Sequence, residues 1–116
     1  AYKIMRLKNA QEVLTAPVLT KLKSETTKHL DKDYDLTFEW SDTRIYCSEL
    51  VWKAYKNSTQ LDIGALQQLK EFDLTHPLVK QKLLERYGTK IPLEEPVISP
   101  GSIAISDLLI TVVDTF

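Results

Sequence analysis

The most informative six residues of this chain are Tyr46-Cys47-Ser48-Glu49-Leu50-Val51. They open a segment, 47–57, in which apolar and small side chains recur at i, i+3, i+4, i+7 and i+8. These side chains are Cys47, Leu50, Val51, Ala54 and Tyr55. The polar residues Asn57, Ser58 and Thr59 then end the pattern. Such spacing predicts an amphipathic helix with the recurring residues on its inward face.

The helix prediction places Cys47, which is the only cysteine of the chain, in a first helical turn. The N–H groups of a first turn lack partners within the helix and carry partial positive charge, which favours a thiolate over a thiol. A nucleophilic cysteine benefits from this, and its own N–H can donate to an oxyanion. The opposite interpretation is a small buried hydrophobic residue, and periodicity alone favours that inert reading.

The rest of the chain predicts one α+β domain over residues 1–116, because no repeat or linker divides it. The expected elements are a strand at 2–8, a polar connection at 9–15, an amphipathic helix from Thr15 to Leu30, an aromatic-rich loop from Asp31 to Trp40, a short helical piece at 66–72, a helix from Thr75 to Tyr87 closed by Gly88, an irregular segment or edge strand at 91–100, and a strand at 108–113.

Composition excludes several classes of protein. The chain is 43% hydrophobic and 27% charged, as globular domains are, and its net charge of −1 lacks the basic excess that nucleic-acid binding requires. Its apolar runs are too short to span a bilayer. A single cysteine excludes an internal disulfide and a zinc finger, and no metal or organic cofactor is expected. The chain opens at Ala1 within a predicted strand, so we expect it to be part of a longer protein.

Two stretches together resemble a known family. They are Tyr34-Asp35-Leu36-Thr37-Phe38 and the run from Tyr46 to Tyr55, and the likeness extends to Phe72, Leu74, Tyr87-Gly88, 91–93 and 97–100. The pattern is similar to the permuted papain-like hydrolases of the YiiX/YaeF type, which are relatives of the NlpC-like cell-wall peptidases. The resemblance implies a permuted papain-like fold with helices packed on an antiparallel sheet, incomplete at its N-terminus.

The resemblance also assigns roles to residues. It implies that Cys47 is the nucleophile and that Tyr34 lines the site and helps to hold the oxyanion. Relatives often carry Gly-x-Pro-Tyr at the second position, whereas this chain has Asp31-Lys32-Asp33-Tyr34. Tyr46 is expected either to form a wall of the cleft or to pack in the core. Glu49 is expected either to support the first helical turn or to recognise a substrate amine.

The expected general base is missing from these residues. The two histidines of the chain are His29, near the end of the first long helix, and His76, at the start of another. Neither matches the histidine motif of the family, so both are interpreted as structural or surface residues. We therefore expect the catalytic histidine to come from an N-terminal portion outside this segment.

The leading functional prediction is a cysteine-dependent amide hydrolase, a peptidase or amidase that forms an acyl-thioester. The resemblance suggests peptide or other small amide substrates, including cell-wall peptides, and an exported or envelope location. Two alternatives remain. The first is a non-catalytic domain of papain-like fold that holds a ligand with the aromatic loop from Tyr34 to Trp40, and the second is an acyltransferase. The sequence leaves the oligomeric state open.

Overall fold

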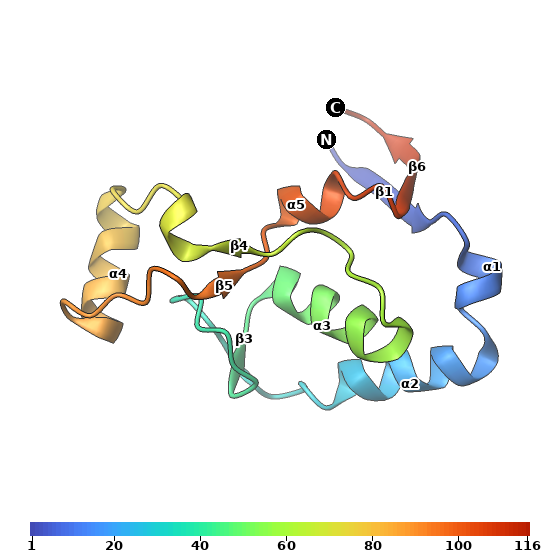
Figure 1. Cartoon of the computed structure of the whole chain (residues 1–116), viewed down its shortest axis with the longest axis horizontal. Helices are drawn as coiled ribbons and strands as arrows, with labels where there is room; N and C mark the ends of the chain where they lie inside the picture. Colours follow the sequence, from blue (N-terminus) through green and yellow to red (C-terminus); the bar gives the residue numbers. More distant parts are fainter.

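Twelve short elements follow one another in the computed structural model, which describes all residues 1–116 (Figure 1). They are β1 (Lys3–Leu7), α1 (Ala10–Val13), α2 (Ala16–Thr27), β2 (Asp33–Tyr34), β3 (Arg44–Ile45), α3 (Cys47–Thr59), β4 (Gln67–Gln68), the 3₁₀ turn η1 (Leu69–Glu71), α4 (Pro77–Tyr87), β5 (Pro96–Val97), α5 (Pro100–Ala104) and β6 (Leu109–Asp114). The predicted α+β class is confirmed. None of the helices is both long enough and apolar enough to cross a membrane.

The strands form three separate two-stranded sheets. β1 pairs with β6 in an antiparallel ladder from Lys3↔Asp114 to Leu7↔Leu109, so the two ends of the chain lie side by side (Figure 1). β4 and β5 are also antiparallel, whereas β2 and β3 are parallel and align Tyr34 with Ile45. The sheet component is therefore divided, and only part of it has the antiparallel pairing expected from the resemblance.

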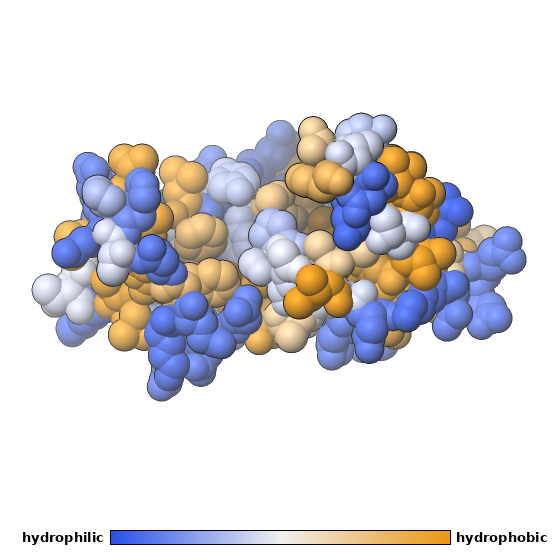
Figure 2. Space-filling model, turned by 90° about the horizontal axis from the view of Figure 1, so that it is seen from above, coloured by the Kyte–Doolittle hydropathy of each residue, from blue (hydrophilic) through white to orange (hydrophobic).

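The hydrophobic core lies between α3, α4 and the β4–β5 pair. Its fully buried members are Tyr46, Leu69, Leu83, Val97 and Ile98. Phe38 and Trp40 from the aromatic loop pack against this cluster, and Phe38 meets the ring of Tyr46 edge-on at 5.4 Å between centroids. Two of the loop's aromatic side chains thus anchor the loop to the core. The space-filling view shows hydrophobic residues at the surface as well, at both ends of the molecule (Figure 2).

Some expected elements differ in the structure. The connection at 9–15 contains the short helix α1, and the piece at 66–72 is β4 followed by a 3₁₀ turn. The strand at 2–8, the helix after Thr15 and the terminal strand are confirmed within a few residues. Gly88 closes α4 as predicted, with φ of 61° and its N–H donating to Leu84 O at 2.8 Å.

The inward face predicted for α3 is wrong in part. Cys47 and Val51 are exposed, and the buried residues of the helix are Ser48, Glu49, Ala54 and Ser58. The Ser48 hydroxyl donates to Ile98 O at 2.8 Å, and Glu49 pairs with Lys53. Hydrogen-bonded polar groups can be buried at low cost, so a pattern of hydrophobic residues does not reveal this face.

Candidate active site

Cys47 occupies the first position of α3, directly after β3 and the extended residue Tyr46 (φ −105°, ψ 163°). Its thiol is exposed. The carboxylate of Glu49 accepts the N–H of Tyr46 at 3.3 Å, which is the side-chain half of a capping box and secures this first turn. The thiol therefore stands at the positive end of a helix of 13 residues and is open to a reactant.

Tyr34 lies beside Cys47 because β2 and β3 pair in parallel. The pairing aligns Tyr34 with Ile45, two residues before the thiol. Partial burial raises the pKa of the Tyr34 phenol, and the neighbouring Cys47 sulfur raises it further. The phenol therefore keeps its proton at neutral pH and remains a hydrogen-bond donor next to the sulfur.

Asp35 fixes the chain that follows Tyr34, a role that the sequence reasoning missed. Its side chain is fully buried, and Oδ1 accepts both the backbone N–H and the hydroxyl of Thr37, at 2.9 and 3.0 Å. Its own N–H donates to Ile45 O at 3.2 Å. The spacing Asp-x-Thr is the available signal, since such residues commonly form local side-chain-to-backbone turns.

Tyr46 is 2% exposed, and its hydroxyl accepts the N–H of Ile98 at 3.3 Å. Burial raises the pKa of this phenol far above its ordinary value. Of the two interpretations of Tyr46, the structure shows core packing.

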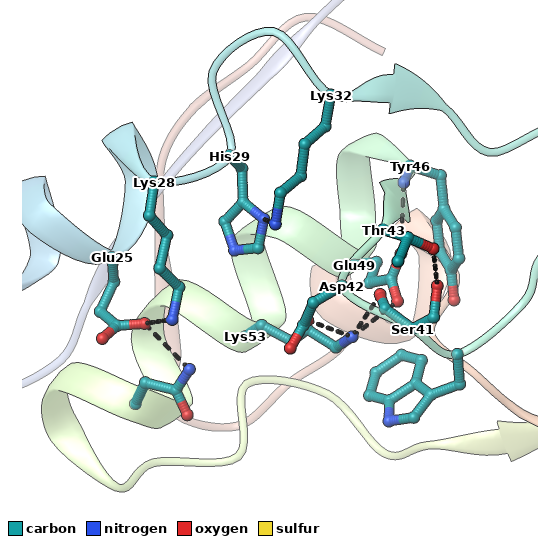
Figure 3. A network of polar contacts seen from close by, with 12 residues as sticks. Glu25, Lys28, His29, Lys32, Ser41, Asp42, Thr43, Tyr46, Glu49 and Lys53 are labelled. Carbon is teal, nitrogen blue, oxygen red and sulfur yellow. Dashed lines mark hydrogen bonds and ion pairs between the residues drawn. The ribbon is translucent and has the colours of Figure 1, made fainter.

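Glu49 is fully buried and forms an ion pair with Lys53, which has several other polar contacts (Figure 3). The Lys53 ammonium lies 2.9 Å from its carboxylate, donates to Ser41 O at 2.9 Å, pairs with Asp42 at 3.0 Å and stands 4.5 Å from the ring centroid of Trp40. Burial raises the pKa of Glu49, and Lys53 opposes this. The Glu49 carboxylate faces the interior of the protein. This position fits a role in stabilising the first turn of α3 better than a role in binding a substrate amine.

The two histidines have other partners. His29 is buried with Nδ1 3.1 Å from the Lys32 ammonium, and burial lowers its pKa (Figure 3). His76 precedes α4, where Nδ1 accepts the N–H of Leu78 at 3.3 Å. No hydrogen bond joins either imidazole to Cys47. No group of three or more His, Cys, Asp or Glu side chains is placed to hold a metal ion.

Comparison with known proteins identifies the family. A family model described as "Permuted papain-like amidase enzyme, YaeF/YiiX, C92 family" matches residues 1–113. The chain belongs to this C92 family. The predicted family and its permuted papain-like fold are therefore confirmed. The assignments of Cys47, Tyr34, Tyr46 and Glu49 as functional residues stay predictions.

Two Escherichia coli relatives of the C92 family show the extent of the match. YiiX of strain K12 is 51% identical over 92 residues, which are 79% of this chain and 46% of the relative. A crystal structure of yiiX from strain O157:H7, described as a metalloprotein, has a TM-score of 0.78 and 45% identity. That match covers 97% of this chain and 61% of the other. The chain thus spans about half the length of the curated relative.

Proposed function

We propose that this chain carries the nucleophile of a cysteine-dependent amide hydrolase, a peptidase or amidase, and that Cys47 is this nucleophile. The observation that carries the proposal is the exposed thiol in the first turn of α3, with the capping contact of Glu49 behind it, in a member of an amidase family. Two hydrogen-bond donors that could stabilise an oxyanion, the Cys47 N–H and the Tyr34 phenol, lie beside the sulfur.

The proposed reaction has two stages. The Cys47 thiolate attacks the amide carbonyl carbon, and the carbonyl oxygen becomes an oxyanion that accepts hydrogen bonds from the Cys47 N–H and the Tyr34 hydroxyl. The C–N bond then breaks, and the amine leaves with a proton from a general acid, which forms a thioester. In the second stage the same group takes a proton from water, the oxygen attacks the thioester, and the acid and the thiolate are released.

The general acid and base is proposed to be a histidine outside these 116 residues. Two observations support this: His29 and His76 are engaged elsewhere, and the curated relative is about twice as long as the matched part. We also propose cell-wall peptides as substrates and an envelope location, which the resemblance of this type of hydrolase to NlpC-like cell-wall peptidases suggests. The E. coli crystal structure is described as that of a metalloprotein, and within these 116 residues no group of three or more His, Cys, Asp or Glu side chains is placed to hold a metal ion.

The test is Cys47→Ala in the full-length protein, assayed with a panel of fluorogenic peptidyl amides. We expect a loss of turnover of roughly a thousandfold or more, because removal of a nucleophile abolishes the covalent route. The circular dichroism spectrum and melting temperature should not change, since the thiol is exposed. Full activity of the variant would overturn the proposal.

Addition of hydroxylamine to the assay would separate hydrolysis from acyl transfer, because an acyltransferase yields mainly the hydroxamate.

A further inference from the structure

A polar pocket of about 240 Å³ is lined in part by Tyr34, the tyrosine that lies beside Cys47. Its lining residues come from the 34–37 segment, from β3 and from α4: Tyr34, Leu36, Thr37, Arg44, Lys82, Glu85 and Arg86. Three of these side chains are cationic and one is anionic. The whole chain has a net charge of −1, so this excess of positive charge is a local property of the pocket.

The three cations are not equally available to a ligand. The Arg86 guanidinium pairs with Glu39 at 2.6 Å, and the Lys82 ammonium lies 3.4 Å from Glu85. Arg44 is exposed and forms no ion pair. An unpaired guanidinium presents parallel N–H donors that match the two oxygens of a carboxylate.

The pocket is adjacent to the proposed nucleophile. Arg44 is three residues before Cys47 and belongs to β3, the strand that leads into α3. Tyr34 is shared, because its side chain lines the pocket and also lies next to the Cys47 sulfur. A substrate group held in the pocket would therefore be a short distance from a carbonyl under attack.

We infer that this pocket binds a carboxylate of the substrate, with Arg44 as its main partner and Lys82 as a second cation. The inference rests on the proposed function and narrows its substrate class to amides that carry a free carboxylate near the scissile bond. Arg44 is thus a specificity-determining residue, and it takes no part in bond making.

The first test compares two alkylating reagents that differ in charge. Iodoacetate and iodoacetamide both alkylate Cys47 as its sulfur displaces iodide, but only iodoacetate carries a carboxylate. The measured quantity is the ratio of the two rates at Cys47 in the full-length protein, by peptide mass spectrometry, relative to the same ratio for free cysteine. We expect a ratio above that of free cysteine. Arg44→Gln should lower it about two- to fivefold, the range of an exposed charge pair.

A matched control removes one positive charge outside the pocket, on α4. Lys80 is exposed and does not line the pocket, so Lys80→Gln should leave the ratio unchanged. High salt should reduce the wild-type preference, since the contact is exposed to solvent. Equal ratios in the wild type and Arg44→Gln, or an equal decrease in Lys80→Gln, would overturn the inference.

The second test uses turnover of a dipeptide and of its C-terminal amide. The wild type should prefer the free carboxylate, and Arg44→Gln should reduce this preference mainly through KM. If neither compound is cleaved but the alkylation ratio still depends on Arg44, the proposed function fails and the pocket stands. If both are cleaved equally and the ratio does not depend on Arg44, the pocket fails and the proposed function stands.

Discussion

The two ends of this molecule are built differently. The part from β2 to β5 contains the buried cluster around Tyr46 and Leu83, whereas β1, α1, α2, α5 and β6 together contribute a single buried side chain, that of Leu7. β1 and β6 pair from Lys3 to Leu7 with one register irregularity between Ile4 and Met5, and the pair leaves large side chains such as Ile110 and Val112 about half exposed. Backbone pairing alone gives little net stability, so stability should be concentrated in the part that also holds the site.

The largest expected difference in the free energy of unfolding is between the loss of a buried ion pair in the part from β2 to β5 and the loss of an exposed ion pair in the β1–β6 ladder. Glu49→Ala would leave the Lys53 ammonium without its buried partner, and we expect a loss of about 3 to 5 kcal/mol in the free energy of unfolding. Asp114→Ala breaks the exposed pair with Lys3 and should cost less than about 1 kcal/mol. Urea denaturation measures both. A loss below 1 kcal/mol for Glu49→Ala would mean that Asp42 and Ser41 alone can hold Lys53.

Truncation of apolar side chains should show the same contrast. Leu83 is 1% exposed, and Leu83→Ala should cost about 2 to 4 kcal/mol because it leaves a cavity in the core. Val112 is 48% exposed, and Val112→Ala should cost about 0.5 kcal/mol. Midpoints of thermal or urea unfolding report the difference. Equal losses at the two sites would show that the β1–β6 pair is as well packed as the core.

The smallest expected effect is on the pH dependence of the free energy of unfolding. Two carboxyls that both pair with Lys53 should change this free energy in opposite directions as the pH rises. Burial raises the pKa of Glu49 above its ordinary 4.5, because the folded protein favours the protonated carboxyl. The resulting stabilisation of the folded state is fully present below pH 4.5 and is lost as the pH rises through the raised pKa. The hydrogen bond from Lys53 lowers the pKa of Asp42 below its ordinary 3.8, so its contribution is present at neutral pH and is lost as pH falls.

Unfolding curves between pH 3 and pH 7 should show these signs. Relative to the wild type, Glu49→Gln should gain stability as pH rises from about 4.5, whereas Asp42→Asn should lose stability over the rise from about 3 to 5. The Asp42 effect should stay below about 1 kcal/mol because that side chain is 69% exposed. The same sign at both positions would contradict the placement of the two carboxyls on either side of Lys53.

The candidate site was predictable only in part. Cys47 at a helix start and Glu49 within the first turn follow from local patterns. The side of α3 that faces the core was not predictable, because Ser48 and Glu49 are buried through partners at Ile98 and Lys53. The Asp35 turn had a local signal that hydrophobic periodicity does not capture.

What the sequence determined by itself was local: the segments that form β1, α2, α3, α4 and β6, the cysteine at the first turn of α3 and the family to which the chain belongs. These depend on residues a few positions apart, where periodicity and capping operate. Only the tertiary structure decided that β1 pairs with β6, that β2 pairs in parallel with β3 and that Arg44 shares a pocket with α4. Those placements join segments distant in the chain, and their partners are selected by packing and hydrogen bonding in three dimensions rather than by any short pattern.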